Sequence, residues 1–461
     1  MKRIVILGAG ESGTGAALLA NAKGYEVFVS DMAVIADKYK TILLEHHIAF
    51  EEAQHTEALI LNAFEVVKSP GIPEKAPIIQ KLRGQHTPII SELELAARYT
   101  NAKIIAITGS NGKTTTTLLT YHLLKKAGFN VGIGGNIGDS MAKQVIEDTF
   151  DYFVLELSSF QLDDLYKFKA DVGMLLNITP DHLDRYNYNF ENYVNSKFRI
   201  LQNQTASDYF ITHIDNEAIT EFLPSHTVRA QLLEISLQHQ VAQGAYLSGE
   251  FMQFAIAGNE FKLSINELPI QGKHNVANAM AAVLGVEAIR IQAGINGPFD
   301  YQALMADFKN AAHRLENVAE INGVTYINDS KATNVDSVFY ALDAMTKPVI
   351  WIAGGVDKGN DYSQIKQLVK AKVKLLVCMG KDNAPLENYF LEVIDNIVST
   401  DTLAEAMKVA SESASSGDVV LLSPACASFD LFKNYEDRGN QFTSKVKSIA
   451  LSVFNSTTPK P

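Results

Sequence analysis

The chain has 461 residues, of which 47% are hydrophobic and 20% are charged, a composition typical of a soluble globular protein with roughly three domains. Its formal net charge of −12 disfavours a nucleic-acid-binding surface. No stretch is long enough to span a bilayer, Gly8 interrupts the N-terminal apolar run too early for a signal peptide, and the distant Cys378 and Cys426 fit free thiols in a reducing cytosol. We therefore expect a cytoplasmic protein that binds no nucleic acid and does not insert into membranes.

The N-terminal segment has the pattern of a Rossmann-like βαβ unit. An apolar run at 3–7 predicts a buried strand, a glycine-rich turn beginning at Gly8 leads into a helix, and a second strand at 25–30 ends at Asp31. Backbone amides at the start of such a helix bind phosphates. Read alone, the pattern suggests NAD, with the Asp31 carboxylate on a ribose. The predicted first domain covers residues 1–94.

A P-loop pattern follows. A β-branched apolar run at 103–107 predicts a strand, and a helical pattern begins near Thr117. In a turn between strand and helix, backbone N–H groups wrap phosphate oxygens, Lys113 reaches the outer phosphates, and the Thr114 hydroxyl can ligate Mg²⁺. The residues of this predicted nucleoside triphosphate site are Gly109, Ser110, Asn111, Gly112, Lys113, Thr114 and Thr115.

Two further side chains of the second segment are candidate metal ligands. Glu156 ends a hydrophobic strand at 151–156, where an acid can project over the phosphates. His182 follows another apolar run, in a loop crowded with charged residues. Mg²⁺ prefers oxygen ligands, so the residues alone support His182 less than Glu156. The alternating pattern at about 225–270 predicts antiparallel hairpins, and the predicted second domain covers residues 95–310.

The third segment, predicted as a domain at 311–461, alternates strands with helical patterns. Such alternation predicts a parallel sheet with helices on both faces. The polar loops 329–334 and 423–430 follow two of these strands, at the edge where open α/β folds bind ligands. A small dicarboxylic substrate could be clamped there by Lys331 or Lys358, with Thr333 and Ser428.

The predicted fold class is therefore α/β in three domains. The first is Rossmann-like, the central one is a P-loop ATPase-like domain with a mostly parallel sheet plus a small antiparallel sheet, and the C-terminal one is again Rossmann-like.

A set of short motifs, in this order and at these spacings, resembles the Mur ligases of peptidoglycan synthesis. The P-loop and the His-Asn and His-Arg motifs are shared with folylpolyglutamate synthases, whereas the motifs beginning at Asn328 and Ser423 are more specific. The motifs are TGSNGKTT from Thr108, GGNIG from Gly134, ELSSFQL from Glu156, DHLDRY from Asp181, GKHN from Gly272, HRLE from His313, NDSKATN from Asn328 and SPACASFD from Ser423.

The resemblance implies an ATP-dependent ligase of cell-wall biogenesis, and more narrowly one that adds D-glutamate to UDP-N-acetylmuramoyl-L-alanine through an acyl phosphate. It further implies a cytoplasmic enzyme, which we expect to be a monomer. The first domain would then bind the uridine diphosphate of the substrate instead of a dinucleotide, with Ser12 near the phosphates and Asp31 near uracil. The same physics applies, because amides at a helix N-terminus meet a diphosphate.

The resemblance also assigns roles residue by residue. Lys113, His182 and Lys197 would be the catalytic group. Lys197 matches a lysine that CO₂ converts to a carbamate, whose anionic oxygens suit Mg²⁺. The metal ligands would be Thr114, Glu156, His182 and Lys197; ATP would also meet Asn275, Arg314 and Asp329; the muramoyl group would meet Asn136; and D-glutamate would meet Thr333, Lys358, Ser428 and Phe429.

Three alternatives stay open at this point. A folylpolyglutamate-type ligase would also add glutamate through an acyl phosphate, although the first glycine-rich domain and the motif at 328–334 argue against it. A P-loop protein could use ATP only as a regulatory switch. An NAD oxidoreductase would leave the P-loop unexplained.

Overall fold

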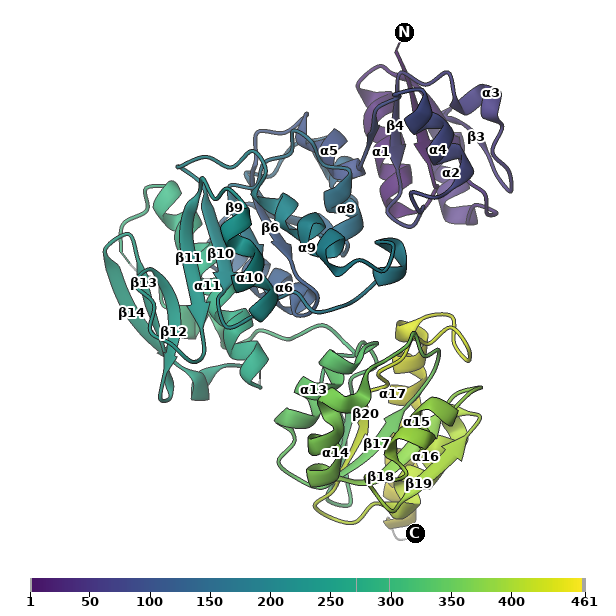
Figure 1. Cartoon of the computed structure of the whole chain (residues 1–461), viewed down its shortest axis with the longest axis vertical. Helices are drawn as coiled ribbons and strands as arrows, with labels where there is room; N and C mark the ends of the chain where they lie inside the picture. The colour runs from purple at the N-terminus through teal and green to yellow at the C-terminus, as the bar shows by residue number, and fades with distance from the viewer. Residues whose placement is uncertain (1, 271, 298, 458–461) are drawn as a thin grey trace. The chain divides into compact units, whose positions relative to one another are not determined.

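The computed structural model describes residues 2–270, 272–297 and 299–457. The chain forms three β-sheets flanked by helices (Figure 1). It divides into two compact units, one of Met1–Pro269 with Val276–Phe308 and one of Ile270–Asn275 with Lys309–Pro461. The first two sheets belong to the first unit, and the predicted boundaries at residues 94 and 310 stay a prediction. Within the described ranges, no helix combines the length and the apolar character needed to cross a membrane.

The first sheet has five strands, all parallel. Its elements and their helices are β1 (Arg3–Leu7), α1 (Glu11–Ala22), β2 (Glu26–Ser30), α2 (Asp37–Glu45), β3 (Ala49–Glu51), α3 (Glu57–Ile60), β4 (Glu65–Lys68), α4 (Pro77–Gly84), β5 (Ile89–Ile90) and α5 (Glu92–Ala97). The strand order β3-β2-β1-β4-β5 matches the Rossmann-like prediction.

Both faces of this sheet are buried, which explains the continuous apolar run of β1. Ile4 and Ile6 face the core that contains α1 and α5, whereas Val5 and Leu7 face the core under α4. Gly13 in α1 makes the close approach of helix and strand possible, because a Cβ there would lie 1.9 Å from the Gly8 carbonyl oxygen.

The central sheet has nine strands in the order β14-β13-β12-β11-β10-β9-β6-β8-β7. Its elements are β6 (Lys103–Thr108), α6 (Lys113–Lys126), β7 (Val131–Gly135), α7 (Met141–Val145), β8 (Tyr152–Glu156), α8 (Ser159–Asp163), β9 (Val172–Leu175), the 3-10 turn η1 (Leu183–Arg185), α9 (Phe190–Phe198), η2 (Arg199–Leu201), β10 (Tyr209–His213), α10 (Glu217–Phe222), η3 (Leu223–Ser225), β11 (Gln231–Ser236), β12 (Gly244–Ser248), β13 (Phe251–Ile256), β14 (Asn259–Ser264), η4 (Ile265–Glu267), α11 (Lys273–Gln292) and α12 (Tyr301–Met305).

The predicted antiparallel hairpins exist, but they extend this sheet instead of forming one of their own. Strand β12 pairs in parallel with β11, and β13 and β14 continue antiparallel from it. Gly244 permits the junction: its φ is +128°, and a Cβ there would lie 1.9 Å from the Glu234 carbonyl oxygen. The sequence pattern predicts antiparallel strands, but it does not show which edge of which sheet these hairpins join.

The first two sheets share one core through α1, α5 and α7. Gly15 of α1 packs so closely on α7 that a Cβ would lie 2.0 Å from Ser140 Oγ. The buried Glu92 carboxylate accepts hydrogen bonds of 2.6 Å from both the Ser140 hydroxyl and the Ala142 amide. This packing makes the first unit a single body.

The third sheet has six strands in the order β15-β16-β20-β17-β18-β19. Its elements are β15 (Glu316–Ile321), β16 (Val324–Asn328), α13 (Val335–Ala344), β17 (Val349–Ala353), η5 (Tyr362–Ile365), α14 (Lys366–Lys372), β18 (Val373–Met379), α15 (Ala384–Phe390), β19 (Ile397–Thr400), α16 (Leu403–Ser413), β20 (Val419–Leu422) and α17 (Tyr435–Thr457). The pair β15-β16 is antiparallel and the other pairs are parallel, so the predicted parallel sheet is confirmed.

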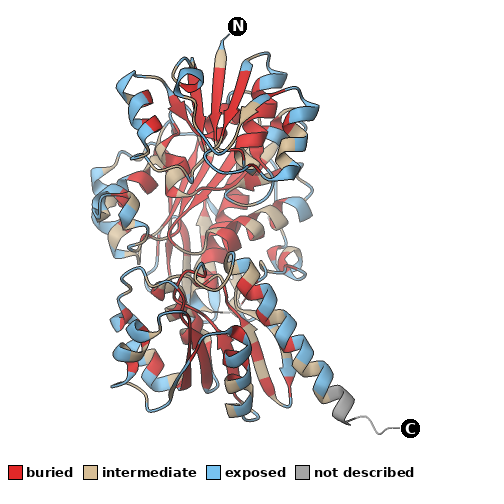
Figure 2. Ribbon diagram, turned by 90° about the vertical axis from the view of Figure 1, so that its right-hand side faces the viewer, coloured by how far each residue is buried: buried red, intermediate tan, exposed pale blue. Residues whose placement is uncertain are grey.

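Helices cover both faces of this sheet, as the alternation predicts. Val349, Trp351 and Ala353 of β17 face α13, α14 and α15, whereas Ile350 and Ile352 face α16 and α17. The central strands are buried while the outer helix faces are exposed (Figure 2).

We predict that Gly13→Ala destabilises the protein. The new methyl group would meet backbone, so helix α1 must shift, and overpacking of this kind costs about 1–3 kcal/mol. The matched control is Gly84→Ala in α4, where a Cβ meets nothing within 4 Å and alanine restricts the unfolded chain. Thermal unfolding should show a lower midpoint for the first variant and an unchanged or higher one for the second; equal midpoints would contradict the packing argument.

Candidate active site

The P-loop joins β6, which lies between β8 and β9 in the central sheet, to α6. Gly112 precedes α6 with a φ of +82°, and a Cβ there would lie 2.5 Å from Asn278 Oδ1. Only glycine satisfies both conditions. The turn therefore aims the N-terminal end of α6 at the site, where a phosphate is stabilised by the helix dipole and backbone N–H groups.

Hydrogen bonds from the segment after β9 hold the P-loop in shape. The Ser110 amide donates to the Asn177 carbonyl at 2.9 Å, and its hydroxyl donates to the Thr179 carbonyl at 2.9 Å. The Asn111 amide donates to Asn177 Oδ1 at 2.8 Å. The loop is therefore preorganised by the neighbouring strand.

Two lysine side chains converge on the Gly109 carbonyl oxygen. Lys113 Nζ lies 2.8 Å from it and 3.0 Å from the Ser110 carbonyl oxygen. Lys197 Nζ, from α9, also lies 2.8 Å from the Gly109 carbonyl oxygen and 4.7 Å from the centre of the Tyr193 ring. Two of the three predicted catalytic residues, Lys113 and Lys197, are thus brought together.

The environment of Lys197 favours its neutral amine. The side chain is buried, and burial, followed by the charge of Lys113, holds the pKa of Lys197 well below its ordinary value. Asp181, Asp163 and Glu156 act in the opposite direction but more weakly. A neutral amine is nucleophilic, whereas an ammonium is not.

Glu156, at the end of β8, presents a carboxylate with one oxygen available. Its Oε1 accepts from Asn136 Nδ2 at 2.8 Å, while its Oε2 is buried with no hydrogen-bond partner among the residues that the structure describes. A buried carboxylate oxygen without a donor is costly. The arrangement therefore fits a carboxylate whose second oxygen would bind a cation.

The donor set fits Mg²⁺ held jointly by protein and phosphate. In the described part of the chain, no group of three or more His, Cys, Asp or Glu side chains could enclose a metal. Mg²⁺ needs no such cage, since it is commonly bound through one or two carboxylates together with substrate phosphates. Glu156 Oε2 and the predicted Thr114 hydroxyl are the hard oxygens that would hold it.

His182 begins the turn η1 in the left-handed region, with a φ of +52°. Its ring lies edge-on to Phe160, with centroids 5.2 Å apart, and Nε2 is 3.5 Å from Asp181 Oδ2. Its side chain is 43% exposed. A metal-ligand role for His182 stays a prediction.

A cavity of about 740 Å³ opens at the carboxyl ends of β1, β2 and β4. It brings the predicted Ser12 and Asp31 together. Both Asp31 oxygens already accept backbone amides, from Ala9 at 2.7 Å and Ala33 at 2.8 Å, so this carboxylate shapes the pocket wall. The other lining residues are Gly8, Gly10, Met32, His55, Glu57, Ser69, Pro70, Gly71, Ile72, Pro73, Ala76, Pro77 and Ile78.

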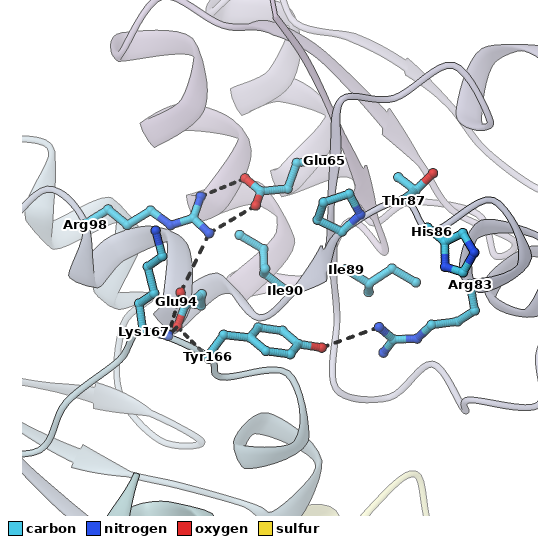
Figure 3. Close-up of a pocket in the computed structure, with 11 residues that line it drawn as sticks. Glu65, Arg83, His86, Thr87, Ile89, Ile90, Glu94, Arg98, Tyr166 and Lys167 are labelled. Atoms are coloured by element: carbon cyan, nitrogen blue, oxygen red, sulfur yellow. Dashed lines mark hydrogen bonds and ion pairs between the residues drawn. The ribbon is translucent and has the colours of Figure 1, made fainter. Parts of the chain in front are cut away.

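A second hollow, of about 420 Å³, lies between α5 and the turn at Tyr166 (Figure 3). Two of its acidic groups have partners within the lining. Arg98 donates to both Glu65 oxygens at 2.7 and 3.0 Å, and the buried Glu94 accepts the backbone amides of Tyr166 and Lys167. These contacts join the two sheets of the first unit.

In the second unit, three loops at the carboxyl ends of β16, β17 and β20 are tied together. The Ala425 amide donates to the Ala332 carbonyl at 3.0 Å, the Gly354 amide to the Pro424 carbonyl at 2.9 Å, and the Val356 amide to the Ala427 carbonyl at 2.8 Å. Both polar motifs predicted for this edge therefore meet in one place.

Sequence reasoning missed Arg438, which lies at the centre of these loops. It is fully buried and donates to Ser330, Cys426 and Gly354. Burial lowers its pKa to about 10. In the sequence it stands in a polar helix like any solvated arginine, so no local signal marks it.

The predicted D-glutamate residues differ in exposure. Ser428 is buried, Thr333 is half-buried and Lys358 is exposed. The Phe429 side chain is 71% exposed. Sequence reasoning also missed Tyr435, whose ring centre lies 3.7 Å from Lys331 Nζ.

Asp329 and Arg314 lie near one another in the same unit. Asp329 accepts from the Ser423 hydroxyl at 2.8 Å and from the Leu315 amide at 3.2 Å. Burial raises the pKa of Asp329 to about 7, against the lowering effects of these hydrogen bonds and of Arg314. Asn275, near the start of α11, belongs to this unit by its contacts.

Comparison with known proteins places the chain in a family. Family models match as the MurD N-terminal domain at residues 3–77, the Mur ligase middle domain at 107–286, and the Mur ligase, glutamate ligase domain at 313–426. A protein of Cytophaga hutchinsonii is 54% identical over 97% of this chain and 99% of its own length. The chain belongs to the Mur ligase family.

Two relatives and one solved structure align with this Mur ligase over nearly the full length of both chains. That Cytophaga hutchinsonii protein is named UDP-N-acetylmuramoylalanine--D-glutamate ligase, as is one of Bacteroides fragilis, which is 52% identical over 97% of this chain and 100% of its own. Among solved structures, the UDP-N-acetylmuramate-alanine ligase MurC of Thermotoga maritima matches with a TM-score of 0.61 and 17% identity, covering 97% of this chain and 99% of its own. That likeness confirms the fold class.

We predict that Asp329→Asn changes how stability depends on pH. The pKa of Asp329 is higher in the folded chain, so the folded state binds the proton more tightly, and this stabilisation is complete below about pH 4 and is lost as pH rises through about 7. Relative to the variant, the wild type should therefore lose up to about 1.4 kcal/mol per pH unit across that window. Unfolding midpoints of both proteins at pH 5 and pH 8 test this, and a difference independent of pH would contradict it.

Proposed function

We propose that this Mur ligase joins D-glutamate to UDP-N-acetylmuramoyl-L-alanine and releases ADP and phosphate, as a cytoplasmic step of peptidoglycan precursor synthesis. The observation that carries the proposal is the 54% identity, over nearly the full length of both chains, with a protein named for that reaction. A monomeric state stays a prediction.

The reaction proceeds in two balanced steps. The L-alanine carboxylate of the sugar nucleotide attacks the γ-phosphorus of ATP, and the bond to ADP breaks, leaving an acyl phosphate. The D-glutamate amine then attacks the acyl carbon, loses a proton, and inorganic phosphate departs as the amide forms. Activation converts a poor leaving group into a good one, so the protein's contribution is positioning and charge stabilisation.

Side chains around the P-loop would provide that stabilisation. Lys113 would leave the loop carbonyls for the outer phosphates of ATP, and the backbone amides of 109–115 would bind the inner ones. Mg²⁺, held by Thr114, Glu156 and the predicted His182, would neutralise charge on the transferred phosphoryl group. A carbamate on Lys197 would replace a buried neutral amine with an anionic group, and the neutral amine is the form that reacts with CO₂.

The substrates would occupy the described clusters. The cavity with Ser12 and Asp31 would hold the uridine diphosphate, and Asn136, beside Glu156, would meet the muramoyl group. In the second unit, Asn275, Arg314 and Asp329 would meet ATP. D-glutamate would contact Thr333, Lys358, Ser428 and Phe429. To these predicted contacts we add Lys331, Tyr435 and Arg438 from the same unit.

A coupled ADP-release assay tests the function. ADP should form only when UDP-N-acetylmuramoyl-L-alanine, ATP and D-glutamate are all present, with L-glutamate, L-alanine, a diamino acid and a dipeptide ineffective. ADP release without an amino acid would support a regulatory ATPase, and turnover with a folate and L-glutamate would support the folylpolyglutamate-type alternative. Either result would overturn the proposal.

We expect Lys113→Ala to lower turnover on the order of 10³-fold, because it removes a charge that stabilises the transferred phosphoryl group. Lys125→Ala, in the last turn of the same helix, is the matched control and should keep near-normal turnover. Near-normal rates for Lys113→Ala in the same assay would refute its role.

Lys197→Ala should be inactive and partly rescued by acetate or formate, since a small carboxylate can replace the missing carbamate oxygens. Methylamine at the same concentration is the control, because it replaces the amine alone. Rescue by methylamine instead of by carboxylates would show that the group acts as a plain lysine.

A further inference from the structure

One arginine ties the turn η1 to the wall of the cavity that contains Ser12 and Asp31, which we call the sugar-nucleotide cavity after its proposed ligand. Arg185 Nη2 donates to the carbonyl oxygens of Pro70 at 3.3 Å and Ile72 at 3.4 Å, and Nη1 donates to that of Gly71 at 3.5 Å. These three residues line the cavity at the end of β4. One planar guanidinium thus spans three consecutive carbonyls, an arrangement that a lysine cannot copy.

The same guanidinium rests on the ring that also contacts His182. Arg185 lies 4.3 Å from the centre of the Phe160 ring, and the His182 ring lies 5.2 Å from it, edge-on. Phe160 belongs to α8, which begins three residues after Glu156. Arg185 therefore connects the cavity wall with Phe160, which lies four residues after Glu156, and with the turn that follows His182.

The backbone of this segment is strained and needs anchors. His182, Asn187 and Tyr188 are non-glycine residues with φ values of +52°, +56° and +56°, a conformation that persists only where the surroundings enforce it. The Tyr186 hydroxyl supplies one anchor by donating to Asp163 Oδ2 at 2.9 Å. Arg185 supplies the other.

A buried lysine reinforces the contact from the other side. Lys68 Nζ donates to the Ile72 carbonyl at 3.3 Å, so this oxygen receives both cations. Lys68 also pairs with Asp164, directly after α8, at 3.0 Å. The 70–72 loop is thereby held to α8 at two points.

We propose that Arg185 is a positioning residue that couples sugar-nucleotide binding to the His182 segment. When a uridine diphosphate group orders the 70–72 loop, the three carbonyls fix Arg185, and Arg185 fixes the backbone on which His182 stands. The nucleotide-sugar identity of the ligand rests on the proposed function; the coupling between the two loops does not.

The test compares Arg185→Ala with Arg98→Ala. Arg98 is also a junction arginine, but its partners are Glu65 and Glu94, outside the cavity wall (Figure 3). UDP is titrated into each protein with and without a non-hydrolysable ATP analogue and Mg²⁺. The analogue should tighten UDP binding about tenfold in the wild type, within the usual range of coupling between sites, and in Arg98→Ala, but less than twofold in Arg185→Ala.

Turnover provides the second readout. Arg185→Ala should raise the KM for UDP-N-acetylmuramoyl-L-alanine about tenfold and lower kcat, with the KM for D-glutamate unchanged, and Arg185→Lys should recover part of the loss because it keeps the charge without the fork. If Arg185→Ala does not fold, Arg185→Lys and Phe160→Leu are compared with Arg98→Ala instead.

The outcomes separate the two ideas. Equal coupling in Arg185→Ala and Arg98→Ala, or no coupling in the wild type, overturns the positioning role whatever the substrate. A wild type that couples UDP to the ATP analogue but does not turn over the three proposed substrates overturns the proposed function and leaves the coupling established.

Discussion

The site depends on one carbonyl oxygen that two lysine side chains share. Gly109 accepts from Lys113 in the P-loop helix and from Lys197 in α9. Two cations at such close quarters, one of them buried, repel each other and favour loss of a proton from the buried one. Under the proposed function, phosphate would meet the positive charge of Lys113, and a carbamate on Lys197 would supply a negative charge that the neutral amine does not carry.

Buried polar groups that lack a hydrogen-bond partner or have a shifted pKa lie at or beside the carboxyl ends of the strands. Glu156 keeps a buried oxygen without a partner in the described chain, Asp329 has a raised pKa and Arg438 a lowered one. Each costs folding free energy that ordinary core residues must offset. Such costs persist where a ligand later supplies the missing charge, which is why these positions define the proposed sites in both units.

The first two sheets behave as one body because small residues let helices approach. Gly13 and Gly15 bring α1 against a strand on one side and α7 on the other, and Glu92, Lys68 and Arg185 add polar ties. These contacts join the sheet that carries the cavity with Ser12 and Asp31 to the sheet that carries the P-loop. Under the proposed function, one of these sites would bring the carboxylate and the other the phosphate that it attacks.

The sequence by itself determined the fold class, the strands at β1, β6 and β17, and the P-loop, because hydrophobic periodicity and glycine-containing turns are local signals. The same local signals indicated Lys113 and Glu156, whereas Lys197 was indicated only by the resemblance to the Mur ligases. Only the tertiary structure decided that β12 joins β11, that Arg438 is buried, that Tyr435 meets Lys331, and that Arg185 reaches the 70–72 loop. These features depend on burial and on contacts between distant segments, which no short window of sequence encodes.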